Sequence, residues 1–376
     1  MSPQLEHAAL LIVASSGRAL AASANRCAQP VVVLDLYNDM DTRGLASSSR
    51  AVASLRGRFD ARRLLAAAAE LCPPERCAGF VYGSGLEART GLIKQVARDR
   101  KLFGNDPDTV ALVKDPVRFF ALLDDLNVAH PTVRLEPPTN SAGWLVKRTG
   151  AAGGSHVRPA TRRHRARARR YFQRFQSGRI LSAVFAANGT RAQMIGYNEQ
   201  WSAGVSWCAP YCYGGAVTCT DLTDAVEIQI ARIAEGLTAA IGLKGINGLD
   251  LILEEGRVFV LELNPRPTAT LELYDRDVDG GLLAAHIRAC CGELPQRPRL
   301  TRARAHAIVY AATPLRVTLR ADWPAWCTDL PAAGSTIPVG APVCSVHAEA
   351  EAPAQAARLA LARREQMQAK LWEKAA

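Results

Sequence analysis

Short hydrophobic runs alternate with helix-like segments along the first third of the chain. Residues 8–14 and 31–36 are apolar enough for buried strands, and residues 79–82 form a third run. Helix-compatible stretches lie between them at 19–26 and 61–71. Because strands that alternate with helices pair in parallel through crossover connections, this pattern predicts an α/β unit with a parallel sheet.

The turn Gly83-Ser84-Gly85 follows the third predicted strand. Ligands of open α/β sheets bind beyond the carboxyl ends of the strands, so this turn is a candidate ligand position. Glycines are also ordinary turn residues, and the signal is weak by itself. A helix is expected over 116–126, with Pro116 at its first position and Asp115 as its N-cap.

The second half of the chain begins with strand-like alternation. Residues 180–187 and 191–197 flank Asn188-Gly189, which predicts a hairpin. A helix over 224–241 has hydrophobic residues at helical spacing and is followed by Gly242. The remaining expected elements are a hairpin of 248–254 with 257–264, strands at 308–312, 316–319 and 342–347, and a helix at 353–374.

These elements combine α/β and α+β organisation in a chain of 376 residues. The length favours two or three domains. We expect an α/β domain over residues 1–110, a catalytic-looking domain over 111–295, and a smaller C-terminal region over 296–376. That last region is β-rich and ends in a helix.

The formal net charge of +11 comes mostly from arginine. It indicates either a solvated basic surface or attraction to an anionic partner such as a nucleotide or an acidic substrate. Within Arg162–Arg170 there are six arginines and one histidine. A solvated surface helix, contact with phosphates or an acidic substrate, and nucleic-acid binding are all open. The run lacks interleaved aromatic residues, which disfavours nucleic acid.

The ten cysteines do not indicate a disulfide scaffold, because the chain is long and its cysteines are dispersed. Cys208, Cys212 and Cys219 are close in sequence, but their spacing fits no familiar zinc template. The N-terminus only faintly resembles a signal peptide, because Glu6 precedes its short apolar run. No run reaches the length of a membrane span. We therefore expect a cytoplasmic protein with reduced thiols and no membrane partner.

The hairpin at 248–264 interrupts its hydrophobic strands with polar residues. A three-residue loop at 255–257 would place Asp250 directly opposite Glu262, with Asn264 on the same face as Glu262. Opposed carboxylates destabilise a sheet unless something neutralises them. Two carboxylates and an amide oxygen suit Mg²⁺ shared with phosphates. The alternative is structural: Glu262 pairs with Arg266, and Asp250 caps a turn.

Gly248-x-Asp250 followed by Leu261-Glu-Leu-Asn-Pro-Arg266 resembles the metal-binding hairpin of the ATP-grasp superfamily. The resemblance implies an ATP-grasp fold with an N-terminal pre-ATP-grasp α/β domain and a small C-terminal region. It implies that Asp250, Glu262 and Asn264 bind Mg²⁺, with Mn²⁺ as an alternative. Arg266 would stabilise the transferring phosphoryl group.

Upstream segments match the same family in order. Val113-Lys114-Asp115 is similar to the segment that opens the ATP-grasp domain, where a lysine commonly touches nucleotide phosphate. Lys147 resembles the family's second phosphate-binding lysine. The resemblance implies that Lys147 binds phosphate and also takes part in catalysis. The stretch after it, Gly150-Ala-Ala-Gly153-Gly154-Ser155, is similar to the mobile loop over the triphosphate. The resemblance thus implies that Gly153, Gly154 and Ser155 form a lid over bound ATP.

Residues 171–178 stand where the family has its hinge, whose backbone groups read adenine. This implies nucleotide contacts from Gln173, Arg174 and Phe175. The sequence departs from the family at two places: the usual hinge glutamate is Gln173, and Ile180 stands where a glutamate usually holds the ribose. Contacts to the ribose would therefore come from other residues.

Within the superfamily, the chain looks most like the carboxylate–amine ligases that include the tyramine–glutamate ligases of methanofuran synthesis. Residues 261–270 (LELNPRPTAT), 82–87 and 213–216 carry this narrower likeness. It implies amide formation through an acyl phosphate, in the biosynthesis of a one-carbon carrier coenzyme of the methanofuran or methanopterin type. The acceptor pocket is expected near 83–87 and 213–216. An acidic substrate would account for part of the arginine excess.

Three further expectations concern partners. The substrates would be a small-molecule carboxylate and an amine, with no nucleic acid. A homodimer is left open. The alternative function is an ATP-binding regulatory or partner subunit without ligase activity of its own, which the altered hinge favours.

Overall fold

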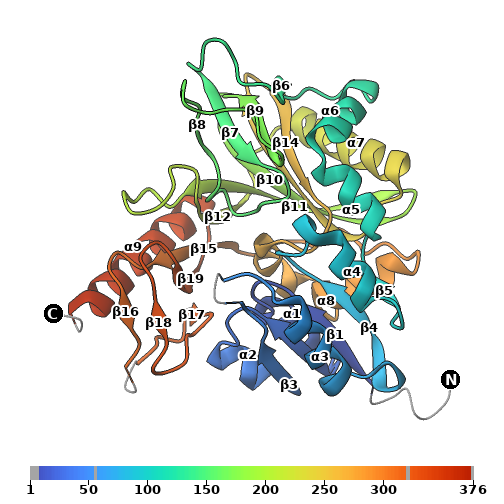
Figure 1. Ribbon diagram of the computed structural model, residues 1–376, viewed down its shortest axis with the longest axis vertical. Coiled ribbons are helices and arrows are strands. Elements are labelled where there is room, and N and C mark those ends of the chain that lie inside the picture. Colours follow the sequence, from blue (N-terminus) through green and yellow to red (C-terminus); the bar gives the residue numbers. More distant parts are fainter. Residues whose placement is uncertain (1–7, 55–56, 319–321, 374–376) are drawn as a thin grey trace.

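The computed structural model describes residues 8–54, 57–318 and 322–373. Its N-terminal parallel sheet lies at one end of the molecule, and a small antiparallel sheet lies at the other (Figure 1). A large antiparallel sheet runs between them, and the C-terminal helix α9 packs at one side of it (Figure 1).

The N-terminal unit is a five-stranded sheet in the order β3-β2-β1-β4-β5, with every pair parallel. Its strands are β1 (Ala9–Val13), β2 (Val31–Asp35), β3 (Ser48–Ala51), β4 (Cys77–Tyr82) and β5 (Leu102–Phe103). Its helices are α1 (Arg18–Asn25), α2 (Met40–Leu45), α3 (Ala61–Leu71) and α4 (Thr90–Val96). The predicted parallel α/β unit is confirmed. The pattern missed β3, β5, α2 and α4, which are short.

Two helices connect this unit to the rest of the chain. Helix α5 (Pro107–Lys114) was not predicted, whereas α6 (Pro116–Asp125) was. Asp115 caps α6, because its carboxylate accepts hydrogen bonds from the backbone N–H groups of Val117 and Arg118. That cap fixes the sharp turn between the helices and holds Lys114 at the end of α5.

The small sheet has the order β6-β9-β7-β8 and is antiparallel. Its strands are β6 (Val133–Arg134), β7 (Trp144–Arg148), β8 (Arg158–Pro159) and β9 (Arg170–Arg174). Between β8 and β9 the arginine-rich stretch consists of turns and extended chain. The expected surface helix over Arg162–Arg170 is therefore wrong. Alternating arginine and alanine bury no apolar stripe there, and a short helix needs one.

The large sheet has eight strands in the order β14-β13-β10-β11-β12-β15-β19-β17. They are β10 (Arg179–Asn188), β11 (Ala192–Ser202), β12 (Tyr213–Cys219), β13 (Lys244–Glu254), β14 (Arg257–Asn264), β15 (Ala303–Tyr310), β17 (Cys327–Thr328) and β19 (Pro342–Ala350). Both predicted hairpins are present. Alternate residues of β10 contact two different cores: Phe185 packs with residues of α7 (Asp224–Ile241), and Val184 packs with residues of α8 (Gly281–Cys290).

Strands β15, β17 and β19 of the segment after residue 295 extend the large sheet. Strand β15 pairs with both β12 and β19, and α9 (Pro353–Glu373) packs on β15 and β19. A two-stranded ribbon of β16 (Leu315–Arg316) and β18 (Thr336–Ile337) lies nearby. The predicted strand end at 319 and helix end at 374 lie outside the described residues. Within the described ranges, no helix is long and apolar enough to cross a membrane.

Candidate functional site

The β13–β14 hairpin places Asp250 directly opposite Glu262, as predicted, but by a different route. Glu254 pairs with Arg257, so the turn contains only Glu255 and Gly256, both with positive φ. A register shift between Asp250 and Leu251 then restores the predicted opposition. The bulge brings two carboxylates face to face where the hairpin approaches the N-terminal unit.

Lys114 and Asn264 complete this carboxylate cluster. The Lys114 ammonium pairs with Glu262 and donates to the Asn264 side-chain oxygen at 3.2 Å. The amide of Asn264 donates to the Asp250 carboxylate at 2.9 Å. From β11, the Gln200 amide reaches the other Asp250 oxygen at 3.4 Å. The structure therefore brings the three predicted metal ligands together with the first predicted phosphate-binding lysine.

The two carboxyl groups differ in acidity because their surroundings differ. Burial would raise the pKa of Glu262, but the charge and hydrogen bond of Lys114, together with the charges of Lys147 and His156, lower that pKa below its ordinary value. Burial and the neighbouring Glu262 charge raise the pKa of Asp250 to about 6. Negative charge thus stays concentrated on Glu262 beside the lysine, an arrangement that a second cation would stabilise further.

Arg266 does not pair with Glu262, so the structural alternative is wrong on this point. Its guanidinium pairs with Glu87, which follows β4 in the N-terminal unit, and also donates to the Asn264 oxygen at 3.3 Å. Both Arg266 and Glu87 are buried. The second oxygen of Glu87 accepts the backbone N–H of Gly85 at 2.6 Å. Glu87, expected near an acceptor pocket, is therefore occupied in holding Arg266.

The small sheet contributes Lys147 from β7. Burial lowers the pKa of Lys147, while the charges of Glu262 and Asp250 act in the opposite direction. This lysine thus lies close enough to the carboxylate cluster to sense both groups. His156, which sequence reasoning missed, also senses the charge of Glu262, and burial lowers its pKa to about 4. Its Nδ1 atom is buried without a hydrogen-bond partner.

The glycine-rich loop is docked on the start of β12. The carbonyl of Gly153 accepts the backbone N–H of Tyr213 at 3.0 Å. A Cβ atom on Gly154 would lie 1.8 Å from the Tyr211 carbonyl oxygen, so only glycine fits this contact. Ser155, also assigned to the predicted lid, is exposed. The loop meets the N-terminal unit as well, since a Cβ atom on Gly150 would lie 2.9 Å from the Ala88 Cα.

The predicted adenine-reading residues lie at the end of β9. Gln173 is buried, and its side-chain Nε2 has no hydrogen-bond partner. The backbone N–H of Arg174 donates to Thr132 at 2.8 Å, and that of Phe175 donates to Gly143 at 2.8 Å. These two N–H groups are used inside the protein. Of the groups named here, the Gln173 amide is the free donor.

Tyr213, in the other segment expected near the acceptor, lies between two acidic groups. Its hydroxyl is 2.6 Å from Nε2 of His306 on β15. Burial raises the pKa of Tyr213, and the charges of Asp250 and Glu272 both contribute. Because Glu272 belongs to the 3-10 helix η4 (Ala269–Leu273), Tyr213 is near both the carboxylate cluster and a second polar region. Sequence patterns gave no signal for His306.

The arrangement fits a nucleotide with a divalent cation. Oxygens of Glu262 and Asn264 already surround one cation, the Lys114 ammonium, and Mg²⁺ takes the same kinds of oxygen ligand. Within the described residues, no group of three or more His, Cys, Asp or Glu side chains is arranged for a metal. Mg²⁺ would thus need the amide oxygen and ligand phosphates beside the two carboxylates. Two buried atoms, Nδ1 of His156 and Nε2 of Gln173, have no hydrogen-bond partner. Buried polar atoms are normally hydrogen-bonded, so a bound ligand would supply the missing partners.

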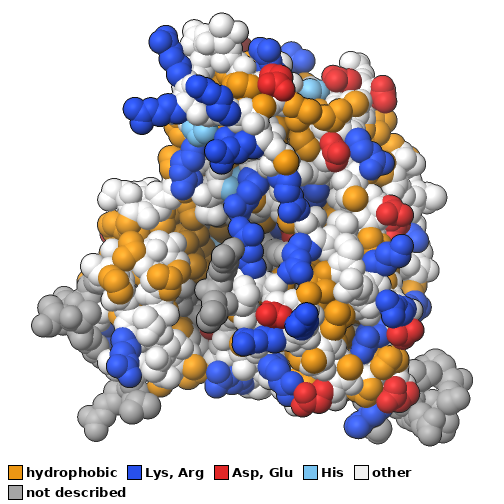
Figure 2. Space-filling view, viewed as in Figure 1, with side chains coloured by type: hydrophobic (Ala, Val, Ile, Leu, Met, Phe, Trp, Pro, Cys, Tyr) orange, Lys and Arg blue, Asp and Glu red, His pale blue; other side chains and the backbone are white. Residues whose placement is uncertain are grey.

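A groove on the protein lies outside the predicted site. A groove of about 1140 Å³ between α6 and α7 is lined by Phe120, Ile228 and Val258, among others, and by none of the predicted site residues. The positive side chains gather on another part of the molecule. Lys and Arg side chains cover the small sheet and continue toward the N-terminal unit (Figure 2).

Comparison with known proteins identifies the fold. Residues 113–270 match the family described as the ATP-grasp domain. An L-amino acid ligase from Bacillus licheniformis has a TM-score of 0.70 at 12% identity, over 95% of this chain and 97% of that one. The ADP complex of N5-carboxyaminoimidazole ribonucleotide synthetase has a TM-score of 0.68 at 13% identity, over 98% of this chain and 97% of that one.

A third similar structure is the biotin carboxylase domain of 2-oxoglutarate carboxylase from Hydrogenobacter thermophilus, a complex with MgADP and bicarbonate. Its TM-score is 0.68 at 11% identity, over 92% of this chain and 87% of that one. Together these likenesses confirm the predicted ATP-grasp fold. They do not name this chain's substrates.

Proposed function

We propose that this protein is an ATP-dependent ligase that joins a small-molecule carboxylate to an amine through an acyl phosphate. One observation carries the proposal. Lys114, Asp250, Glu262 and Asn264 converge at the end of one hairpin, and Lys147 approaches them from the small sheet. The nucleotide and amino acid ligases with the same fold support this reading.

The chemistry needs two displacements. A carboxylate oxygen of the first substrate attacks the γ-phosphorus of ATP, the bond to the bridging oxygen breaks, and ADP leaves. The nitrogen of the amine then attacks the acyl carbon, phosphate leaves, and the amine loses a proton. Catalysis of this kind depends on positioning and charge neutralisation rather than on a protein nucleophile.

In this scheme each residue of the cluster would have a task. Asp250, Glu262 and Asn264 would hold Mg²⁺, which would neutralise charge on the phosphates of ATP. Lys114, released from Glu262, and Lys147 would bind phosphate oxygens. Arg266, held by Glu87, would stabilise the phosphoryl group in transfer.

The docked loop has a separate task. With the Gly153 carbonyl bound to the Tyr213 N–H, Gly153, Gly154 and Ser155 would form a lid over bound ATP. In that position the loop would keep water from an acyl phosphate, which hydrolyses readily. The Gln173 amide, with its unpartnered Nε2, would contact the base, beside Arg174 and Phe175.

For the substrates, the likeness in residues 261–270 supports a role in the biosynthesis of a one-carbon carrier coenzyme. The test is a screen for ADP release with MgATP and pairs drawn from carboxylates and amines, including L-glutamate with tyramine. Release that requires both partners is expected. Tight ATP binding with no turnover by any pair would instead favour an ATP-binding regulatory subunit, and release that ignores the amine would contradict the ligase.

A further inference from the structure

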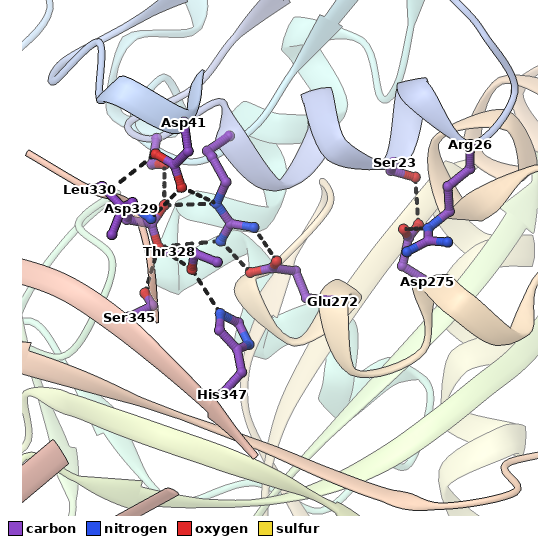
Figure 3. Close-up of polar contacts among 12 residues, drawn as sticks. Ser23, Arg26, Asp41, Glu272, Asp275, Thr328, Asp329, Leu330, Ser345 and His347 are labelled. Atoms are coloured by element: carbon purple, nitrogen blue, oxygen red, sulfur yellow. Dashed lines mark hydrogen bonds and ion pairs between the residues drawn. The ribbon is translucent and has the colours of Figure 1, made fainter. Parts of the chain in front are cut away.

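A second polar cluster surrounds Arg18, the first residue of α1. Its guanidinium pairs with Glu272 of η4 and with Asp329, which follows β17. Asp41 of α2 lies 3.8 Å from the same guanidinium. Figure 3 shows Asp41, Asp329 and Glu272 converging from three separate segments, with His347 and Ser345 beside them. The cluster therefore joins the N-terminal unit to the C-terminal strands.

Negative charge exceeds positive charge in this cluster. Asp35 and Asp39 lie close enough to Asp329 for its charge to act on both carboxyl groups. The cluster has five carboxylates: Asp35, Asp39, Asp41, Glu272 and Asp329. Among the described residues, Arg18 is the one Lys or Arg side chain that forms ion pairs with them, and it reaches three: Asp41, Glu272 and Asp329. One guanidinium cannot neutralise five carboxylates, so burial of the excess charge is costly.

Asp39 is the member whose carboxylate has no hydrogen-bond partner among the described residues. It is only 6% exposed. It begins α2, where an aspartate usually caps the helix, yet its side chain accepts no hydrogen bond there. By contrast, Asp35 accepts three backbone N–H groups, and Asp41 accepts two. Burial and the surrounding carboxylates raise the pKa of Asp39 to about 8.

His306 gives an independent sign that a ligand belongs here. The residue is 2% exposed, and its Nδ1 has no hydrogen-bond partner. Charges of Glu272, Asp329 and Arg18 all act on its pKa, which burial lowers to about 4. Its Nε2 is 2.6 Å from the Tyr213 hydroxyl, and Tyr213 also senses Asp250. The cluster is thus contiguous with the proposed phosphoryl-transfer site.

We propose that the cluster around Asp39 binds a positively charged nitrogen group, an ammonium or guanidinium, carried by one of the two substrates. This inference rests on the proposed function, whose substrate class it narrows. Metal ions are the other cations that carboxylates bind, but the described residues hold no carboxylate–histidine group arranged for a metal. An organic cation needs no fixed coordination geometry, and its N–H groups can meet the free Asp39 oxygens and the unpartnered His306 nitrogen.

The charged nitrogen could belong to an amino acid donor or to a polyamine acceptor, and titration calorimetry separates these sources. The probes are L-alanine, L-glutamate, putrescine and agmatine. Propionate, glutarate and 1,4-butanediol are matched analogues of the first three that lack the charged nitrogen. Each is titrated into the full chain saturated with the non-hydrolysable β,γ-methylene analogue of ATP and Mg²⁺. Binding by the amino acids alone would identify a donor subsite, and binding by the polyamines an acceptor subsite.

The decisive comparison uses Asp39→Asn, which keeps the shape and removes the charge. Loss of one partner of a buried charged hydrogen bond weakens binding by about 30-fold or more. We expect that loss for the cation that binds, and no change in Glu70→Gln, which alters an exposed carboxylate of the same domain. Equal affinity in Asp39→Asn, equal binding of the uncharged analogues, or no binding of any cation would overturn the proposal.

The nucleotide titration keeps the two proposals apart. If the methylene analogue binds but no cation does, the cation subsite is wrong and the ligase stands. If the analogue itself fails to bind, the proposed function fails first. Thermal unfolding of Asp39→Asn shows that the variant is folded, because a loss of binding with an unchanged or raised Tm cannot come from misfolding.

Discussion

The Lys114 ammonium pairs with the Glu262 carboxylate, although the two residues are 148 positions apart. Helix α5 and strand β14 bring them together, and Asn264 supplies a second oxygen to the same ammonium at 3.2 Å. A cation therefore already occupies the place where the carboxylate and amide oxygens meet. Because Mg²⁺ takes the same kinds of oxygen ligand, its binding would replace the ammonium at these oxygens and free Lys114 for phosphate.

Glu262→Gln should abolish turnover. The substitution keeps the shape but removes the charge that balances Lys114 and would bind the metal. A fall in the rate of ADP release of at least about 100-fold is expected from the loss of one group that neutralises phosphoryl charge. The control is Glu365→Gln on the exposed face of α9. A near wild-type rate in Glu262→Gln would remove this residue from the site.

Lys147→Ala should weaken nucleotide binding more than it lowers stability. Burial lowers the pKa of this lysine, so the free protein gains little from its charge, whereas bound phosphate would gain an ion pair. We expect the Kd for MgATP to rise about 10-fold or more. Calorimetry measures it, with the exposed Lys94→Ala as the control. Unchanged affinity for MgATP would contradict a role in phosphate binding.

A comparison of Gly153→Ala with Gly154→Ala distinguishes the effect of loop docking from the effect of backbone strain. Gly153 and Gly154 have φ of 72° and 68°, so alanine costs about 1–2 kcal/mol of strain at either position. Only at Gly154 does the added Cβ meet the Tyr211 carbonyl, while at Gly153 it meets nothing within 4 Å. Gly154→Ala should therefore lower turnover well below that of Gly153→Ala. Equal rates would mean that docking of this loop is not needed for catalysis.

The Glu87–Arg266 pair should matter far more for stability than the exposed pair Arg50–Glu70. Side chains of the first pair are 2% and 7% exposed, whereas those of Glu70 and Arg50 are 61% and 42% exposed. Glu87→Gln leaves a buried guanidinium uncompensated, which costs about 3–5 kcal/mol. Glu70→Gln should lower stability far less, because solvent screens an exposed ion pair. Urea unfolding of both variants checks the difference, and similar losses would contradict it.

Asp39 should make the protein less stable as the pH rises from about 4 to 8. Its pKa rises from 3.8 in an unfolded chain to about 8 in the fold, so over this range the folded state retains a proton that the unfolded state loses. The loss of stability is at most about 6 kcal/mol, because each pKa unit corresponds to about 1.4 kcal/mol. Charged and titratable groups that act on Asp39 are Asp35, Tyr37, Asp41 and Asp329, with Arg18 opposing the carboxylates.

Asp39→Asn should remove that dependence and raise Tm at pH 8 more than at pH 5. Thermal unfolding across this range measures the effect, with Glu70→Gln again as the control. A lower Tm for Asp39→Asn at pH 8 would mean that the carboxylate has a stabilising partner, and would count against an unsatisfied charge held for a ligand.

The sequence predicted the local elements that periodicity controls, and it missed those that tertiary contacts control. The opposition of Asp250 and Glu262 was right, yet the two-residue turn and the bulge near Leu261 replaced the expected loop. Bulges depend on packing around both strands, so no local signal fixes them. Helix α5, which holds Lys114, was missed because its apolar face is short and it joins directly to α6.

Partners far apart in sequence were the least predictable part of the site. Arg266 stands next to Glu262 in the hairpin motif, but its partner is Glu87 of another domain. Similarly, His156, Tyr213 and His306 acquire their electrostatic neighbours only through folding. Family resemblance gave the order of the ATP-grasp residues, while the carboxylates around Asp39 match no motif and emerged from the structure alone.

The most direct test of carboxylate activation follows an oxygen atom of the substrate carboxylate into the released phosphate. The acid that stimulates ADP release in the substrate screen is prepared with ¹⁸O in its carboxyl group, and the released phosphate is analysed by mass spectrometry. An acyl phosphate intermediate predicts one labelled oxygen in each phosphate molecule, because the amine displaces phosphate with the former carboxylate oxygen attached. Phosphate without label would show that the carboxylate never attacks ATP, and would contradict the proposed reaction.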